Sequence, residues 1–422
     1  MARRPAVAQI TLACCLSVFT GCSGGGTTPT PTPAPTPTPT GPTSGAEFLY
    51  TFGFIGDVQV ATLNTTTGTI SSLTDAAPNL IPSLEASRGN TFAAFLPGKY
   101  FYVAAFDQSA GSGAVFAFTI TGVHGELTSI LSSPYDIPID FPTGIAIDGQ
   151  GKYLYVSGGN IIRVFQIDKD TGILTNTGRV FSYGNAELAV QCGDSTGRYI
   201  YTLEYGDGIA SIHILSIGFA GALTEVPGSP LLVYSAPSGS RMIPQLLVNP
   251  TGSYLYLLVR STDSLTGTFT KASVYSFSID AATGALTAVP SSPFNLTISN
   301  PIPFNGEITM SPNGEFLYIP EINQSSEEKS MSVYAMDPAQ GTIGLAPASS
   351  ITSTDEFDDA NLIDPSGQFL ISRSANATTW GYWSNTINGS TGSLSPVTGS
   401  PFDVNNPISS ASYGGSAIVR IP

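Results

Sequence analysis

The stretch "TGALTAVPSSPF", Thr283 to Phe294, returns almost unchanged as "TGSLSPVTGSPF", Thr391 to Phe402. Weaker copies bring the number to seven, and every copy has a glycine at its second position. These glycines are Gly68, Gly125, Gly172, Gly221, Gly284, Gly341 and Gly392. They follow one another at a mean spacing of about 54 residues, and repeats of roughly this length are typical of propeller blades.

A second motif precedes each copy after the first. It is a glycine turn followed by an aromatic and β-branched run, as in "GKYLYV", which is typical of a hairpin. One unit then contains an inner strand "TGIAIDG", a second strand "KYLYV", a third strand "IIRVFQID" and an outer strand "ILTNTG". The sequence therefore predicts an all-β protein, a seven-bladed β-propeller of four-stranded antiparallel blades.

The first unit lacks an inner strand, because the predicted fold begins at "EFLYTFG". The C-terminal segment "ISSASYGGSAIVRIP" is the expected donor of that strand. We therefore predict that the C-terminal strand closes the ring and covers an otherwise bare sheet edge.

The composition agrees with many short strands. Of 422 residues, 41% are hydrophobic and 11% are charged, with 45 Gly and 32 Pro. The formal net charge is -15, and no basic run could neutralise a row of phosphates, which argues against nucleic acid as a partner. We expect a monomer.

The first 45 residues predict targeting and a tether. Residues 1–22 have a basic start, an apolar stretch and a cysteine, Cys22, as in a bacterial lipoprotein signal peptide, although Phe19 stands where Leu is usual. The alternative is an ordinary secretory signal. Residues 23–45 form a Gly/Thr/Pro-rich linker, and residues 46–422 form the propeller. We therefore expect an extracytoplasmic protein of the bacterial cell envelope, lipid-anchored through Cys22, its only link to the membrane.

The combination of "GKYLYV" with "VYSFSID" and "TGALTAVPSSPF" resembles the lactonase-like seven-bladed propellers, a family that includes 6-phosphogluconolactonases and carboxymuconate cycloisomerases. The resemblance spans residues 46–422. It implies a catalytic glutamate after the second strand of a blade, and Glu204 in "YTLE" and Glu321 in "YIPE" match that place. It also implies an Arg-His pair that leads into the inner strand. This pair is missing here, since Glu187 stands near that place for Glu204 and Asn305 for Glu321.

The ligand site of such a ring is expected where the connections between blades meet the loops that leave the second strands. Arg241 is the cation that we expect to hold an anionic ligand group; the alternative is that it pairs with a neighbouring glutamate and fixes a loop. Further predicted ligand-binding residues at this mouth are Arg88, Asp140, Glu187, Glu307 and Arg373.

Other reactive side chains are few. His124 occupies an outer turn, and His213 aligns with the aromatic residues Phe165, Tyr275 and Tyr334 of sister units, which predicts a packing role between blades. Cys192 is expected to be a buried structural thiol. Two histidines are too few for a usual multi-histidine metal site, so no metal and no cofactor are predicted.

The acidic run "TDEFDDA" near residue 355 could collect Ca²⁺, but its spacing matches no defined Ca²⁺ loop, which favours a solvated loop.

Two functions remain open at this stage. The first is a binding scaffold for a protein, glycan or small-molecule ligand. The second is a lactonase-like hydrolase that opens a cyclic ester at the channel mouth, with Glu204 or Glu321 and Arg241 in the catalytic site.

Overall fold

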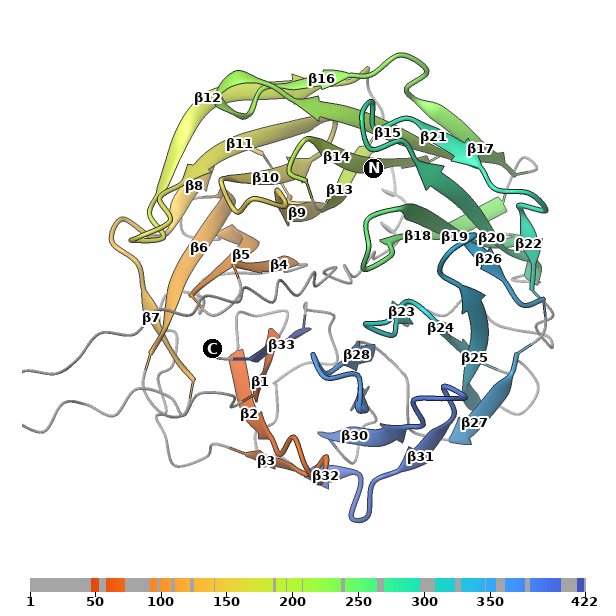
Figure 1. Cartoon of the computed structure of the whole chain (residues 1–422). Coiled ribbons are helices and arrows are strands. Elements are labelled where there is room, and N and C mark those ends of the chain that lie inside the picture. Colours follow the sequence, from red (N-terminus) through yellow and green to blue (C-terminus); the bar gives the residue numbers. More distant parts are fainter. Residues whose placement is uncertain are drawn as a thin grey trace, which may run out of the picture.

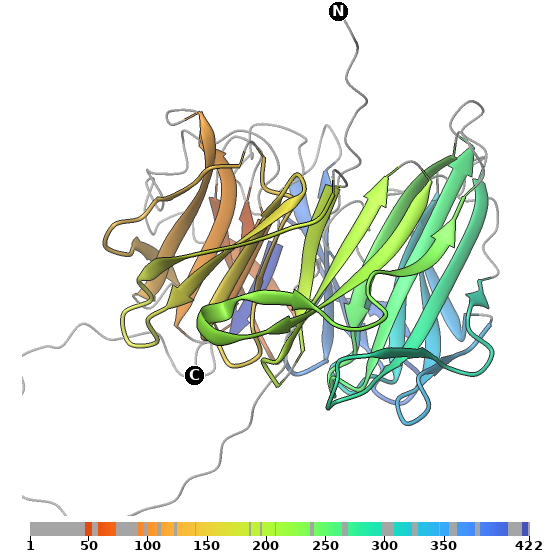
Figure 2. The same ribbon diagram turned by 90° about the horizontal axis from the view of Figure 1, so that it is seen from above.

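The computed structural model describes residues 47–52, 58–72, 92–96, 99–107, 111–121, 125–139, 141–184, 187–194, 196–206, 208–236, 240–263, 269–296, 308–322, 328–345, 347–353, 361–375, 380–403 and 416–420. These residues form seven antiparallel sheets arranged as blades around a central axis, with the strands running between the two faces of a disc (Figures 1 and 2). The predicted seven-bladed propeller is therefore confirmed. The predicted signal peptide and linker lie outside the described residues.

Each blade has a path of four strands from the inner to the outer edge of the ring. Blade 1 consists of β33 (Ser416–Arg420), β1 (Glu47–Phe52), β2 (Val58–Leu63) and β3 (Ile70–Ser72). Blade 2 consists of β4 (Phe92–Leu96), β5 (Tyr100–Asp107), β6 (Ser112–Thr121) and β7 (Glu126–Ser129). Blade 3 consists of β9 (Gly144–Ile147), β10 (Tyr153–Gly158), β11 (Ile161–Ile167) and β12 (Leu174–Ser182).

The remaining blades follow the same order. Blade 4 consists of β13 (Glu187–Gly193), β14 (Tyr199–Gly206), β15 (Ile209–Ile217) and β16 (Leu223–Glu225), with a short 3₁₀ helix η2 (Phe219–Gly221). Blade 5 consists of β18 (Ser240–Val248), β19 (Tyr254–Asp263), β20 (Phe269–Ile279) and β21 (Leu286–Ala288). Blade 6 consists of β23 (Thr309–Met310), β24 (Phe316–Ile322), β25 (Lys329–Asp337) and β26 (Thr342–Ile343). Blade 7 consists of β28 (Asn361–Ile363), β29 (Phe369–Ala375), β30 (Trp380–Ile387) and β31 (Leu394–Pro396).

Five blades carry a short fifth strand that the four-strand unit did not include. These strands are β8 (Tyr135–Ile137), β17 (Leu231–Ser235), β22 (Phe294–Asn295), β27 (Ser349–Ser353) and β32 (Phe402–Asp403). Each pairs with the third strand of its blade beyond the end of the outer strand. In blade 4, Ser229 lies in the connection between the outer strand β16 and the fifth strand β17. Its Oγ accepts a hydrogen bond from the backbone N–H of Ile214. Ser133, Ser292 and Ser400 accept the same bond in blades 2, 5 and 7.

The repeated glycine joins neighbouring blades. Gly284 of blade 5 has a φ of +72°, and a Cβ there would lie 2.5 Å from the Tyr199 ring of blade 4. At each of the other six repeat glycines, a Cβ would come within 2.9 Å of an aromatic ring of the preceding blade. The Tyr102 hydroxyl of blade 2 also donates to the carbonyl of Gly172, at 2.9 Å. Glycine is therefore required because the chain turns with positive φ where another blade leaves no room for a side chain.

The turns between inner and second strands also repeat. The Asp148 carboxylate accepts the backbone N–H groups of Lys152 and Tyr153, and Asp194 does the same for Arg198 and Tyr199. Asp148 and Asp194 are both buried, and their carboxylates stabilise these turns.

The ring closes as predicted. Strand β33 pairs antiparallel with β1, with Arg420 opposite Glu47 and Ser416 opposite Thr51. The apolar core fills the spaces between blades; one cluster joins Tyr102 of blade 2 to Ile145 and Phe165 of blade 3.

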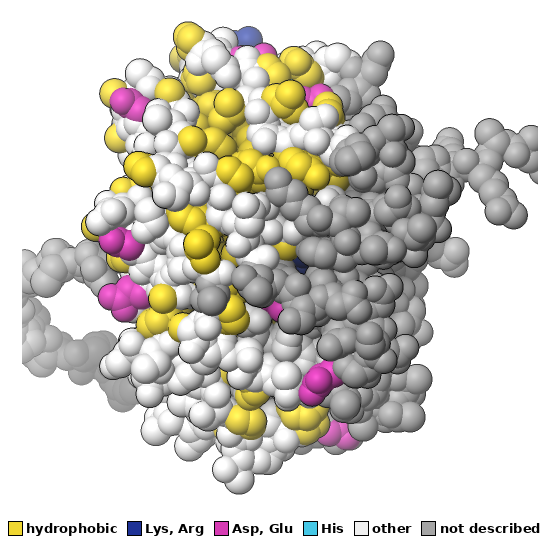
Figure 3. All heavy atoms as spheres, turned by 90° about the vertical axis from the view of Figure 1, so that its right-hand side faces the viewer, with side chains coloured by type: hydrophobic (Ala, Val, Ile, Leu, Met, Phe, Trp, Pro, Cys, Tyr) yellow, Lys and Arg dark blue, Asp and Glu magenta, His cyan; other side chains and the backbone are white. Residues whose placement is uncertain are grey.

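The side of the molecule drawn in Figure 3 carries few charges. One side of the disc shows scattered hydrophobic side chains and several separate acidic ones (Figure 3). In the described part of the chain, no helix has both the length and the apolar character needed to cross a membrane.

Candidate functional site

The two faces of the disc differ in what they carry. On one, which we call the turn face, lie the turns from inner to second strands and the repeat glycines. On the other, the loop face, the second strands end and the chain passes from blade to blade. Glu204 and Glu321 stand near the loop-face ends of β14 and β24, where the candidate site was predicted.

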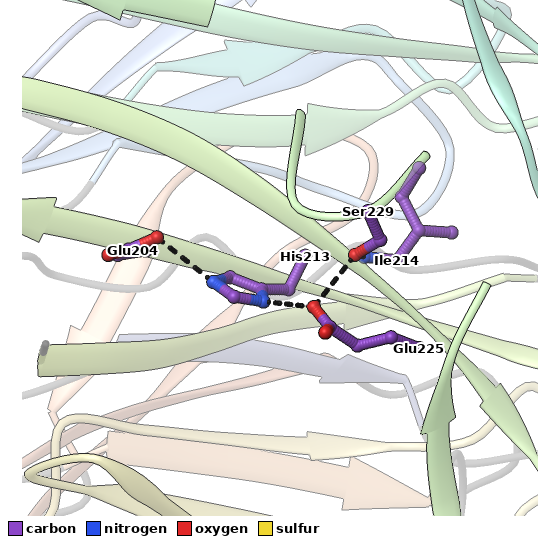
Figure 4. A network of polar contacts seen from close by, with 5 residues as sticks. All are labelled: Glu204, His213, Ile214, Glu225 and Ser229. Carbon is purple, nitrogen blue, oxygen red and sulfur yellow. Dashed lines mark hydrogen bonds and ion pairs between the residues drawn. The ribbon is translucent and has the colours of Figure 1, made fainter. Parts of the chain in front are cut away.

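Glu204 is part of a hydrogen-bonded network in blade 4 (Figure 4). Its Oε2 lies 3.1 Å from Nε2 of His213, and Nδ1 of the same ring lies 2.7 Å from Oε1 of Glu225. The Ser229 hydroxyl donates to that Glu225 oxygen at 3.0 Å. Glu204 is 7% exposed and His213 is fully buried. The imidazole is therefore held between two carboxylates inside the blade.

Three consecutive strands supply this network. Glu204 lies in β14, His213 in β15 and Glu225 in β16, so it extends from the second strand to the outer one. The His213 ring also meets the ring of Tyr183, from the end of blade 3, edge-on at 4.3 Å between centroids. The expected packing role of His213 between blades is thus observed, but sequence reasoning missed its two carboxylate partners.

The predicted alignment of His213 was partly wrong. The second strands of blades 3 to 6 share a tyrosine, which we call the blade tyrosine: Tyr155, Tyr201, Tyr256 and Tyr318. His213 pairs with Thr202, one position after Tyr201, and Tyr275 has the equivalent place in blade 5. Phe165 and Tyr334 instead pair with the residue before their blade tyrosines, two positions away. The turn of blade 4 after its third strand is one residue shorter than that of blade 5, which shifts an alignment counted from the repeat glycine.

Glu321 has a different basic neighbour, Arg260 of blade 5. Burial raises the pKa of Glu321 to about 7, against the opposing effects of the Ser332 hydroxyl, the Arg260 guanidinium and the Tyr334 hydroxyl. Arg260 is 4% exposed and donates to the Pro320 carbonyl and, at 2.9 Å, to Oε1 of Gln245. Burial lowers the pKa of Arg260 to about 10. Glu321 is thus a partly exposed residue with one buried carboxyl oxygen, and its pKa lies near neutral pH.

The glutamates therefore do have basic neighbours, although not from the segments where the Arg-His pair was sought. His213 comes from the third strand of the same blade, and Arg260 from the second strand of the preceding blade. Both lie close only because of the strand pairing and blade packing.

The other predicted site residues are distributed as follows. Arg373, in β29 of blade 7, is 5% exposed. Glu187 and Arg241 lie at the loop-face starts of β13 and β18, where their backbones pair with Tyr205 and Thr262; their side chains lie outside the described residues. Arg88, Asp140 and Glu307 also lie outside the described residues, as do Cys22 and the acidic run near residue 355.

A separate cavity of about 410 Å³ opens on the turn face between blades 3 and 4, lined by Asp148, Lys152 and Phe219 among others. The Asp148 carboxylate at this cavity already accepts the N–H groups of its own turn, so it serves the fold. Cys192 is buried in the core shared by blades 4 and 5, as predicted. Within the described ranges, no three His, Cys, Asp or Glu side chains are grouped so as to hold a metal ion.

The architecture defines the class of protein: a seven-bladed β-propeller whose structural neighbours are 6-phosphogluconolactonase-like proteins. A periplasmic gluconolactonase of Pseudomonas aeruginosa is 18% identical, with a TM-score of 0.61, over 89% of this chain and 100% of the other. A Bacteroides uniformis protein, provisionally named a 6-phosphogluconolactonase, is 18% identical with a TM-score of 0.59 over the same shares. A Lactobacillus plantarum protein is 19% identical, with a TM-score of 0.58 over 83% and 95%.

No family model and no curated protein matches this sequence. At this level of identity the likeness to solved structures establishes the fold alone, and the chemistry has to be argued from the residues present.

Proposed function

We propose that this protein is a hydrolase that opens cyclic esters, with Glu204 as the general base. The observation that carries the proposal is the contact between Glu204 and His213, 3.1 Å apart in a nearly closed position at the loop face. An imidazole that contacts one oxygen of a carboxylate holds that carboxylate in a fixed orientation, which general-base catalysis requires. The lactonase names of two structural neighbours support the choice of a cyclic ester.

In the proposed reaction, a water molecule loses a proton to the Glu204 carboxylate while its oxygen attacks the ester carbonyl carbon. The bond between that carbon and the ring oxygen then breaks, and the ring oxygen takes the proton from Glu204 to become a hydroxyl group, which restores the Glu204 carboxylate. The product is an open-chain hydroxy acid. His213 orients Glu204 throughout. Arg241, at the loop-face start of β18, is the proposed partner for an anionic group of the substrate.

Glu321 is the alternative base. Its pKa of about 7 suits proton transfer at neutral pH, and Arg260 lies beside it. The two glutamates occupy different blades, so single substitutions can separate their roles.

The test is hydrolysis of a panel of sugar lactones by the purified propeller. We expect Glu204→Gln to lower kcat by about 100-fold or more, the usual contribution of a general base, and Glu321→Gln to have a smaller effect. Glu315→Gln, an exposed glutamate of the turn face, is the matched control and is expected to change nothing. A wild-type rate that neither Glu204→Gln nor Glu321→Gln alters would overturn the proposal.

A second candidate function is non-catalytic ligand binding. It is favoured by the burial of the basic groups: His213 is fully buried with both ring nitrogens occupied, and the Arg260 guanidinium bonds to Pro320 and Gln245. In that case the propeller is a scaffold for a protein, glycan or small ligand at its loop face. Absence of lactone hydrolysis, together with specific retention of a glycan or envelope component, would favour this function.

For location, we propose an extracytoplasmic place in the cell envelope through lipid on Cys22. The sequence of residues 1–22 motivates this, and one structural neighbour is named as periplasmic. Fatty-acid labelling of wild type and Cys22→Ala in a bacterial host tests it; equal labelling would contradict it.

A further inference from the structure

We infer that the cavity between blades 3 and 4 on the turn face binds a saccharide, with Tyr153 and Phe219 as its main contacts. This site lies on the opposite face of the disc from Glu204 and does not depend on the proposed hydrolysis. Its volume of about 410 Å³ falls within the usual range of small-ligand pockets. The observation that carries the inference is a departure of the blade 4 turn from the repeat.

The turn between β15 and β16 of blade 4 differs from its counterparts in the sister blades. In five blades an Asp or Asn begins this turn, and its side chain accepts two N–H groups of the turn: Asn64, Asp168, Asp280, Asp337 and Asn388. In blade 4 the same place is taken by Gly218, and the turn is one residue shorter. Ala220 within it has a φ of +55°, which is unfavourable for a residue with a Cβ. The blade 4 turn therefore lacks the side chain that stabilises the turn elsewhere.

The shorter turn leaves one tyrosine hydroxyl without its usual acceptor. In three blades the first residue of the second strand is a tyrosine that donates to the next blade's turn, at the carbonyl two positions before the repeat glycine: Tyr100 to Asp170, Tyr199 to Ala282 and Tyr254 to Ala339. Tyr153 is the counterpart in blade 3. Within the part of the chain that the structure describes, the Tyr153 hydroxyl makes no hydrogen bond. Tyr153 is 6% exposed and lines the cavity, so this hydroxyl is available to a molecule in the cavity.

Blade 3 supplies further polar groups to the same cavity. Nζ of Lys152 lies 5.1 Å from the centroid of the Tyr153 ring. Gln150 donates from Nε2 to the Thr196 carbonyl at 2.9 Å, which leaves its Oε1 available to accept. From blade 4 comes Phe219, which is 88% exposed, more than any other large hydrophobic side chain among the described residues. The cavity therefore combines several hydrogen-bonding groups with a bare aromatic ring.

This combination fits a sugar ring. A sugar hydroxyl donates and accepts hydrogen bonds, as a tyrosine hydroxyl and a glutamine amide do, and the C–H groups of the ring form an apolar face that packs on an aromatic side chain. An anion is disfavoured, because the Asp148 carboxylate lines the same cavity and the chain has a formal net charge of -15. A purely apolar ligand would cover the Tyr153 hydroxyl without pairing it.

Tyr153→Phe and Tyr199→Phe form a matched pair of tests. The Tyr153 hydroxyl has no acceptor in the described fold, so we expect Tyr153→Phe to weaken saccharide binding about fivefold and to leave the free energy of unfolding unchanged. Tyr199→Phe removes the hydroxyl bonded to Ala282, so it should lower stability and leave binding unchanged. Phe219→Ala should weaken binding about tenfold. The probes are glucose, galactose, N-acetylglucosamine, cellobiose and chitobiose, with dissociation constants measured by saturation-transfer NMR.

A turn exchange provides a second test. The segment "IGFAGAL", Ile217 to Leu223, is replaced by the blade 5 segment "IDAATGAL", Ile279 to Leu286, which restores the aspartate and the missing residue. We expect this variant to be at least as stable as wild type and to bind saccharide at least about tenfold more weakly. Glu204→Gln should bind as wild type does, which separates this site from the proposed hydrolysis.

Two results would overturn the saccharide site. One is that none of the five probes binds to the wild-type protein. The other is that wild type, Tyr153→Phe and Phe219→Ala bind the probes equally well. Absence of lactone hydrolysis would contradict the proposed function and leave the saccharide site standing.

Discussion

Gly284 of blade 5 lies against the ring of Tyr199 in blade 4, so closely that a Cβ on Gly284 would come within 2.5 Å of the ring. The Tyr199 hydroxyl donates to the Ala282 carbonyl in the same turn, at 2.6 Å. This relationship explains why the "TG" motif repeats along the chain: its glycine is the point at which one blade contacts the next.

Gly284→Ala should therefore destabilise the protein strongly. The left-handed backbone costs a non-glycine residue about 1 to 2 kcal/mol, and the overpacked contact with Tyr199 adds about 1 to 3 kcal/mol. The measurement is the free energy of unfolding in urea. Gly178→Ala is the control, because Gly178 has a φ of +70° and no neighbouring atom within 4 Å of its would-be Cβ. Equal losses in the two variants would show that the blade contact has no effect of its own.

Tyr102→Phe tests the hydroxyl contact between blades. Tyr102 is fully buried, and its hydroxyl donates to the carbonyl of Gly172 at 2.9 Å. Removal leaves a buried acceptor without this donor, at an expected cost of about 1 to 3 kcal/mol in thermal or urea unfolding. Tyr254→Phe, which loses an exposed contact to Ala339, is expected to cost less. A larger loss for Tyr254→Phe would contradict this account.

Glu47 should make stability depend on pH. Its pKa is raised from 4.5 to about 7 by burial and by nearby Asp364, against the opposing effect of Arg420. The folded state thus favours protonated Glu47 more than the unfolded state does. The resulting contribution to the free energy of unfolding is complete below pH 4.5 and is lost as the pH rises through about 7. Glu47→Gln should flatten that decline in the free energy of unfolding, whereas Glu315→Gln should not. An unchanged pH profile in Glu47→Gln would refute the assignment.

Ser229 and Ser292 offer a matched pair. Each accepts a third-strand N–H, at 3.0 Å, from Ile214 and Ser276 respectively, and Ser229 also donates to Glu225. We expect each change to alanine to cost about 1 to 3 kcal/mol, and Ser229→Ala to cost about 1 kcal/mol more because Glu225 loses a donor. Chemical unfolding measures both. Identical losses would mean that the bond to Glu225 contributes nothing to stability.

The architecture could be predicted because its information is local and repeated. The repeat glycine is required by a positive φ and by contact with an aromatic ring, and the sequence shows the glycine and the aromatic residue in every unit. The closing strand could be predicted because β1 otherwise lacked an inner neighbour. The fifth strand was missed, since segments such as β22 contain only two residues and have no periodic pattern.

The site was harder to predict because its contacts cross strands and blades. Glu204 and Glu321 were found from their place after the blade tyrosine. Their partners His213 and Arg260 were not, because strand register and blade packing decide which side chains meet. The signal that could have found His213 is its place directly before Ile214, the partner of Tyr201, which the shorter turn of blade 4 obscures.

The pairing of β1 with β33 has a mechanical consequence. The first and last described strands lie side by side in one sheet, so a pull applied to both ends of the propeller would load this single short ladder before any other. Blade 1 would then part while six blades, each made of consecutive segments, remained intact. The ring should therefore resist tension only as well as these few backbone hydrogen bonds do.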